Sequence, residues 1–267
     1  MSRVDVTYFT DPYCPWSWAA EPLLRRLAVE FAEDAQITYV IGGMAQALED
    51  RVAFASDWLN AGAASGMPVD PRGLLDDPPT ATHPAGLAVK AVAEQGDPGP
   101  FLRRLREAIM VDRGRMDRGD ALLAVARETV PAPRLDVLRI AFGSNAIVEA
   151  LGADLERART AGAGGLGVPL PSLHLRGADG VLHSVEGAQP YERVREAMVL
   201  AGAAPATTAA PSVEAALRRF GSMATPEIAA ACALPGPRAS SELWRLAVEW
   251  RVTPRSVLGG ELWRLAT

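Results

Sequence analysis

Cysteine, histidine and lysine are all scarce in this chain of 267 residues. The chain has 2 cysteines, Cys14 and Cys232, together with 3 histidines, and Lys90 is its only lysine. Two cysteines so far apart in sequence exclude a disulfide-rich scaffold and suit a reducing compartment. The histidines are widely spaced and form no metal-ligand pattern, so we expect no bound metal.

Long apolar runs and a strong net charge are missing as well. No stretch approaches the roughly 20 apolar residues of a membrane span, and no signal peptide precedes the first apolar run, residues 4–9. The net charge of −5 argues against broad binding to nucleic acid or anionic membranes. With 49% hydrophobic residues, the sequence is typical of a soluble globular protein, which we expect in the cytoplasm.

The hydrophobic periodicity predicts an α/β fold in the order βαβ, a large helical insertion, then ββα. Residues 4–9 and 36–41 alternate like strands, and a helical pattern begins between them at Pro15. Residues 44–162 are predominantly helical, with a long surface loop expected at 57–79 and a continuous helix at 135–159. Strands return at 171–176 and 180–185, joined by the turn signal Gly177-Ala178-Asp179-Gly180, and a helix at 190–201 closes the core.

A run of small residues at 203–211 is the best candidate for a linker between two domains, 1–202 and 212–267. Beyond it, three helical patterns and a hairpin at 252–266 suggest a winged-helix-like module. The helix that would enter a DNA groove carries Glu242 and Glu249, which repel phosphates. We therefore expect this module to contact protein or to act as a stabilising lid, and do not expect nucleic-acid binding.

Cys14 is the strongest candidate for chemistry. It follows a predicted strand and precedes a helix that begins with Pro15, in the run Asp11-Pro12-Tyr13-Cys14-Pro15-Trp16-Ser17-Trp18. Backbone N–H groups at a helix start point at the sulfur and favour the thiolate. We therefore expect a thiol pKa lowered from about 8.5 into the range of roughly 3.5–7.5. Cys232 lies in an apolar helical run and is expected to be a buried structural thiol.

The run from Phe9 to Leu27 resembles the C-x-x-C opening of DsbA-family thioredoxin-fold proteins. The resemblance is closest to the cytoplasmic branch that includes FrnE-like oxidoreductases and adaptor proteins of the ClpXP protease. Further stretches of resemblance lie at 83–96, 101–108, 167–175 and 187–190, so residues 1 to about 202 are covered in the family's order. The resemblance implies a thioredoxin-like core with an inserted helical bundle, as the periodicity also predicts.

One position departs from the family pattern. Ser17 stands where the family usually has its second, resolving cysteine. A Cys14 thiolate can still attack a disulfide, but Ser17 cannot resolve the mixed disulfide that forms. Its hydroxyl could instead donate a hydrogen bond to the thiolate. Ser17 is thus consistent with a monothiol reaction and equally with a groove used only for binding.

The resemblance also implies a cis-proline before the third core strand, facing the sulfur. Pro171 matches that position best, in the run Val168-Pro169-Leu170-Pro171-Ser172. We expect the catalytic set to be Cys14, Ser17 and Pro171, with substrate contacts from Pro15, Trp16 and Leu170.

The primary hypothesis is therefore a thiol-disulfide oxidoreductase-like protein acting through one cysteine, with a protein disulfide or a low-molecular-weight thiol as co-substrate and no permanently bound cofactor. A non-catalytic adaptor that uses the same groove is the first alternative. A kappa-type glutathione transferase or isomerase is the second. The sequence leaves the oligomeric state open.

Overall fold

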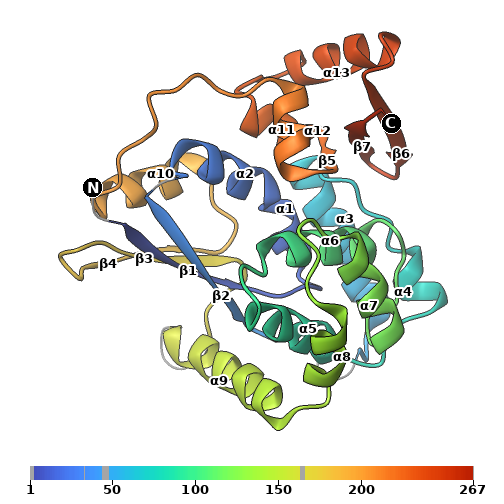
Figure 1. The fold of residues 1–267 in the computed structure, drawn as a ribbon, viewed down its shortest axis with the longest axis vertical. Helices are drawn as coiled ribbons and strands as arrows, with labels where there is room; N and C mark the ends of the chain where they lie inside the picture. Colours follow the sequence, from blue (N-terminus) through green and yellow to red (C-terminus); the bar gives the residue numbers. More distant parts are fainter. Residues whose placement is uncertain (1–2, 33, 44–47, 163–165, 267) are drawn as a thin grey trace.

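The computed structural model describes residues 3–32, 34–43, 48–162 and 166–266. A four-stranded sheet in the order β2-β1-β3-β4 forms the centre of the first domain (Figure 1). Strand β1 (Val4–Thr10) pairs in parallel with β2 (Ala35–Ile41) and antiparallel with β3 (Ser172–Arg176), which pairs antiparallel with β4 (Leu182–Glu186). The predicted α/β class is confirmed.

Alternating side chains of β1 cover the two faces of this sheet. Val4, Val6 and Tyr8 are buried against α2 (Glu21–Glu30) and α10 (Tyr191–Leu200). Phe9 points to the opposite face, toward α9 (Asn145–Ala161). The helical pattern that begins at Pro15 is divided at Ala20 into α1 (Pro15–Ala19) and α2.

The helices between β2 and β3 form the predicted insertion, whose expected start at residue 44 lies outside the described residues. Its core gathers around large buried side chains such as Trp58, Phe101 and Leu105. The helices are α3 (Arg51–Ser65), α4 (Arg72–Asp76), α5 (His83–Ala93), α6 (Gly99–Met110), α7 (Gly119–Glu128), α8 (Leu135–Ala141) and α9.

Two predictions about this insertion are wrong. The expected loop at 57–79 contains most of α3 and all of α4, because Asp50 caps α3 by accepting the Ala53 N–H at 2.9 Å and Trp58 anchors it in the core. Gly66, with φ of +73°, then ends that helix. The expected single helix at 135–159 is two helices, because Ser144 caps α9 by accepting the Ile147 N–H at 3.4 Å.

The C-terminal module has its own core, which includes Leu217, Ile228, Leu243 and Trp263. Residues 212–266 form three helices and a three-stranded sheet in the order β5-β7-β6, in which β6 and β7 are the predicted hairpin and β5 is a strand that the sequence analysis missed. Its winged-helix character stays a prediction, as does the domain division at 203–211. The elements are α11 (Val213–Phe220), β5 (Met223–Ala224), α12 (Thr225–Ala231), α13 (Arg238–Val248), β6 (Val252–Val257) and β7 (Gly260–Leu265).

The C-terminal module is docked on the first domain through a buried ion-pair cluster, with α12 lying beside α2 (Figure 1). Glu227 of α12 is fully buried, and its Oε1 accepts hydrogen bonds from Arg25 Nε and Arg103 Nε, each at 3.0 Å. Arg103 Nη2 donates to Glu227 Oε2 at 2.7 Å. Because Arg25 is on α2 and Arg103 on α6, Glu227 joins the module to both the core and the insertion.

None of the helices in the described ranges combines the length and the apolar character needed to cross a bilayer.

Candidate functional site

Cys14 lies directly before the first turn of α1, as the sequence predicts. It is the N-cap residue, with an extended backbone (φ −73°, ψ 114°), and Pro15 is the first helical residue. The Ser17 N–H donates to Cys14 Sγ at 3.4 Å, so the sulfur takes the place of a capping oxygen. The end of β1 and the start of α1 therefore fix the thiol in position.

On the side away from α1, the thiol contacts the chain directly before β3. Because Phe9 pairs with Ser172 in the sheet, the chain before β3 passes beside the end of β1. The Cys14 thiol donates to the Leu170 carbonyl oxygen at an Sγ–O distance of 3.8 Å. The Leu170–Pro171 peptide bond is cis.

The expectation of a lowered thiol pKa is wrong. Cys14 is only 2% exposed, and burial raises its pKa above the ordinary value because a thiolate loses its hydration there. Ser17 and the positive charge of Arg106 favour the thiolate, but they do not outweigh burial. The helix-start argument omitted this desolvation, which a sequence does not reveal. Burial therefore favours the neutral thiol over the thiolate.

Ser17 lies one helical turn after Cys14 and is fully buried. Its hydroxyl has no hydrogen-bond partner of ordinary geometry among the described residues, although it is near enough to the thiol to favour the thiolate. A buried hydroxyl without a partner is costly. It would gain a strong acceptor only if Cys14 were ionised.

The insertion fixes the orientation of the Cys14 turn. Trp18 is fully buried, and its indole Nε1 donates to the Pro68 carbonyl at 2.9 Å. Trp16 Nε1 donates to Asp57 Oδ1 at 3.0 Å, and the Tyr13 hydroxyl accepts the Met116 N–H at 3.1 Å. Three aromatic side chains around Cys14 are therefore attached to the helical insertion.

A buried pair of charges lies behind the thiol. Arg106 is 1% exposed, and its Nη1 donates to Glu21 Oε1 at 2.7 Å. Its Nη2 donates to Thr10 Oγ1 at the end of β1. Glu21 is also 3.8 Å from Arg103 Nε, which connects this pair to the Glu227 cluster. Sequence reasoning missed these residues, because arginines of an amphipathic helix such as α6 ordinarily face water.

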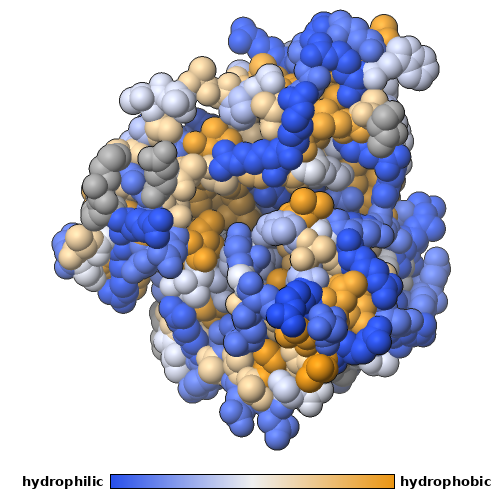
Figure 2. Space-filling model, viewed as in Figure 1, coloured by the Kyte–Doolittle hydropathy of each residue, from blue (hydrophilic) through white to orange (hydrophobic). Residues whose placement is uncertain are grey.

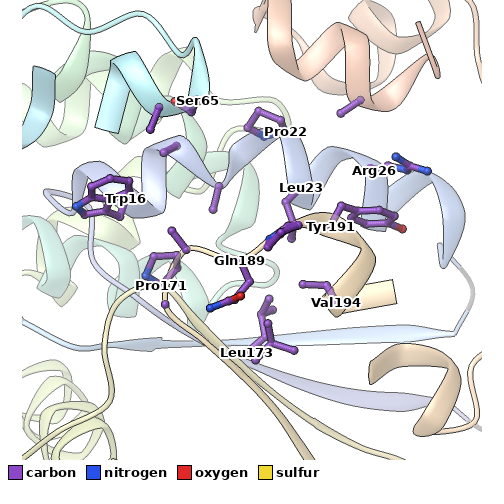
Figure 3. A pocket seen from close by; sticks show the side chains of 18 of the residues that line it. Trp16, Pro22, Leu23, Arg26, Ser65, Pro171, Leu173, Gln189, Tyr191 and Val194 are labelled. Atoms are coloured by element: carbon purple, nitrogen blue, oxygen red, sulfur yellow. The ribbon is translucent and has the colours of Figure 1, made fainter. Parts of the chain in front are cut away.

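An open groove of about 490 Å³ runs from Trp16 and Pro171 along α2 and α10 (Figure 3). Its lining is mostly apolar, and apolar side chains gather in a hollow on the face of the molecule seen in Figure 2. The middle is formed by Leu23, Leu173 and Gln189, and the far end by Tyr191 and Arg26. The groove, unlike the sulfur, is accessible from solvent.

The residues expected at the site fall into two groups. Cys14, Ser17 and Leu170 meet at the buried sulfur, whereas Trp16 and Pro171 line the groove. The Leu170 side chain packs against Phe9 and Val40 on the other face of the sheet, so only its carbonyl serves the site. Pro15 is buried and absent from the groove lining, so the structure gives no support to a substrate contact there.

Sequence reasoning missed most of the groove, including Leu23 and Arg26 of α2 and Tyr191 of α10. Helical periodicity predicts that α2 and α10 have apolar faces, but not that part of those faces stays open. Within the described residues, no group of three or more His, Cys, Asp or Glu side chains is arranged to bind a metal ion.

A family model described as "Thioredoxin" matches residues 8–163. The chain belongs to this thioredoxin family. The match covers more than half of the chain and includes the end of β1, the Cys14 turn and the helices of the insertion. With its helical insertion, the chain has a DsbA-like fold, which it shares with the solved structures below.

Two curated relatives are similar over almost the whole chain. The ClpXP adapter protein SpxH of Halalkalibacterium halodurans is 26% identical over 98% of this chain and 88% of its own length. The protein of the same name from Bacillus subtilis is 24% identical over 98% of this chain and 89% of its own length. Coverage this high includes the C-terminal module.

Solved structures resemble a smaller part of the chain. The cytosolic disulfide reductase DsbM of Pseudomonas aeruginosa has a TM-score of 0.61 and 23% identity, and covers 73% of this chain and 98% of its own. A structure of the same protein with GSH has a TM-score of 0.59 and 21% identity, with the same coverage. At this identity the likeness establishes the fold alone.

Proposed function

We propose that this thioredoxin-family protein is an adapter, which binds a segment of a client protein in the groove between α2 and α10. One observation carries the proposal: the groove is open, while the neighbouring thiol is 2% exposed and its pKa is raised by burial. Thiol-disulfide exchange needs an accessible thiolate, whereas binding needs only the groove.

Two further features support binding. Ser17 cannot resolve a mixed disulfide formed at Cys14. The relatives similar over 98% of the chain, module included, are described as ClpXP adapter proteins. We extend that role to this chain as a proposal: it presents client proteins to a ClpXP-type protease, in the cytosol.

A second candidate function is favoured by the geometry at Cys14. The sulfur accepts the Ser17 N–H, lies near the charge of Arg106 and faces the cis peptide bond at Pro171. The disulfide reductase DsbM has the same fold and has been solved with GSH. This candidate is a monothiol reductase in which a low-molecular-weight thiol resolves the mixed disulfide. The kappa-type transferase alternative stays a prediction from the sequence.

One experiment separates the two functions. A photo-crosslinking amino acid at position 16 captures proteins from a lysate in a Cys14→Ser background and in the parent. Each captured protein is then incubated with purified ClpXP and ATP, with and without this chain. An adapter gives the same capture in both backgrounds and accelerates degradation of a captured protein. A matched variant with the crosslinker at Ser240, an exposed position of α13, controls for nonspecific capture.

The reductase gives a different result. Without irradiation, a reductase forms mixed disulfides that require Cys14 and are released by dithiothreitol, and a captured protein is degraded at the same rate with or without this chain. That outcome would overturn the adapter proposal.

A further inference from the structure

The groove is not built by the thioredoxin core alone. Pro226 and Ala230 of α12, in the C-terminal module, belong to its lining, together with Ala64 and Ser65 at the end of α3. In Figure 3 the α3 end lies above Trp16, and a helix of the C-terminal module lies above α2. One wall of the groove therefore comes from a different module.

Glu227 fixes the position of this wall. It follows Pro226 directly, is fully buried, and is bound by Arg25 and Arg103 as described above. Glu227 Oε2 also accepts the Ala224 N–H at 2.7 Å, which attaches the start of α12 to the same carboxylate. Pro226 and Ala230 are thus presented on a helix whose docking is set by buried charges.

The far end of the groove carries one cation. Among the described residues that line the groove, Arg26 is the only charged one. Its guanidinium lies 4.4 Å from the centroid of the Tyr191 ring, and its side chain is 43% exposed. Glu30 is nearby, but Glu30 already accepts hydrogen bonds from Tyr191 Oη at 2.7 Å and Arg195 Nε at 2.5 Å, and it stays 3.7 Å from Arg26 Nε.

Arg26 forms an ion pair with Glu30, but no hydrogen bond from its guanidinium reaches an acceptor among the described residues, so its N–H groups remain available to a ligand. A guanidinium positioned on an aromatic ring suits a carboxylate, which it can bind through two parallel hydrogen bonds.

The length of the groove indicates the size of its occupant. Trp16 and Arg26 are ten residues apart on two consecutive helices, which corresponds to about 15 Å at 1.5 Å per residue. An extended chain covers that length with about four or five residues at roughly 3.3 Å each.

We infer that the C-terminal module is part of the binding site, and that the groove takes an extended client segment of about four or five residues, apolar in the middle and acidic at the Arg26 end. This inference rests on the proposed function and adds the class of segment that is bound. The side chains lining the middle, with Pro22, Leu23 and Leu173 among them, suit aliphatic residues. The small side chains of Ala19, Ala20 and Ala230 let a backbone approach closely.

The test uses the full chain and fluorescein-labelled hexapeptides with the sequence Gly-Leu-Ala-Leu-X-Gly, where X is Glu, Gln or Lys, measured by fluorescence anisotropy. A second set has the reversed order, because the direction of the chain in the groove is open. We expect the Glu peptide of one set to bind at least about tenfold more tightly than its Lys partner, which corresponds to 1.4 kcal/mol. Arg26→Gln should remove this preference and leave the Gln peptide unaffected.

The contribution of the module is tested by Ala230→Trp, which places a large side chain on the groove side of α12. We expect binding of every peptide to weaken at least tenfold, with circular dichroism and thermal unfolding unchanged. Ser240→Trp, an exposed position of α13, is the matched control and should bind as the parent does. Ala230→Trp could also disturb the docking of α12 on α2. Ala230→Ser adds only a hydroxyl and should therefore weaken peptide binding by a smaller factor.

The outcomes distinguish the inference from the proposed function. If Trp16→Ala weakens peptide binding but Ala230→Trp does not, the groove binds clients without the module and this inference is wrong. If Arg26→Gln leaves the preference for the Glu peptide intact, the inference that an acidic client residue binds at Arg26 is wrong. If no peptide binds and no protein is captured at position 16, the proposed function fails as well.

Discussion

Cys14 occupies the position of a catalytic nucleophile at the start of a helix, but burial opposes the ionisation of its thiol. The backbone turn and the Ser17 N–H stabilise negative charge on the sulfur, while its removal from water opposes that charge. In this chain the second effect is larger, since the thiol is 2% exposed and its pKa is raised. The two effects make a clear prediction for chemical modification.

We expect alkylation of Cys14 by iodoacetamide to follow a raised pKa. In a Cys232→Ala background, the rate at pH 7 should be below that of a small-molecule thiol, of which a few per cent is ionised at that pH. The rate should still be increasing above pH 9, because the thiolate forms only there. The measurement is the pseudo-first-order rate from pH 6 to 10 by mass spectrometry, and a plateau below pH 7.5 would contradict it.

A second prediction concerns Ser17, which lies one helical turn after Cys14. Ser17→Cys should give a pair of thiols able to form a disulfide, because the residue 17 N–H is already 3.4 Å from Cys14 Sγ. Mild oxidation should then remove two free thiols and lower the mass by two hydrogens. The variant should also reduce insulin faster than the parent. Ser240→Cys is the matched control, and an unchanged thiol titration in Ser17→Cys would refute the prediction.

At the residue scale, the sequence was informative where a motif is local. The position of Cys14 before a helix follows from the run of residues around it, whereas the cis-proline at Pro171 follows only from the family resemblance. The burial of Cys14 could not be predicted in this way, because the groups that cover it come from the insertion and from the chain before β3. Arg106 was missed for the same reason.

At the scale of elements, α9 shows how the insertion is attached to the sheet. Asp154 of α9 is 8% exposed, and its Oδ2 accepts the Ile41 N–H at 2.9 Å and lies 2.8 Å from Lys90 Nζ. A backbone group at the end of β2 and a side chain of α5 therefore share one carboxylate. The only lysine of the chain is used for this contact.

We expect Asp154→Ala to lower the free energy of unfolding by about 2–3 kcal/mol, because a buried N–H and a half-buried ammonium lose a charged partner. Urea unfolding measures the change. Glu149→Ala, on the exposed side of the same helix, should change stability by less than about 0.5 kcal/mol. Equal effects of the two substitutions would show that Asp154 has no special role.

Most elements could be predicted from periodicity, and the errors have physical causes. The helical character predicted for residues 44–162 holds for α6, whose polar and apolar side chains lie on separate faces. The Pro, Gly and Asp residues of the segment 57–79 favour a loop when the sequence is considered alone. Residues 57–65 nevertheless continue α3, since Trp58 packs into the insertion core and Ala61 is fully buried. Tertiary burial outweighed local composition there.

At the scale of the whole molecule, the buried charges around Glu227 join three parts of the chain. Burial alone would raise the Glu227 pKa, but Arg103 and Arg25 lower it to about 2. The ordinary value is about 4.5. Because the pKa is lower in the folded state, the stabilisation is fully present above about pH 4.5 and is lost as the pH falls toward 2.

This behaviour gives a prediction for the Glu227→Gln variant. Near neutral pH it should be less stable than the parent by about 3–5 kcal/mol, the usual cost of removing one partner of a buried pair. The difference should shrink as the pH falls from 4.5 toward 2. Urea unfolding across this range measures it. Glu242→Gln, which breaks only an exposed pair with Arg245, should have a small effect, and a pH-independent difference for Glu227→Gln would contradict the argument.

The groove is lined by residues from the core, from the end of α3 and from α12, which are far apart in the sequence. This has a consequence for synthesis of the protein. Trp16 and Arg26 are made among the first residues, Pro171 and Tyr191 much later, and Pro226 and Ala230 only near the C-terminal end. A nascent chain on the ribosome therefore has no complete groove until α12 has emerged. Client recognition of the kind proposed here would begin only with the finished polypeptide. A product that ends before α12 would lack the side of the groove formed by Pro226 and Ala230.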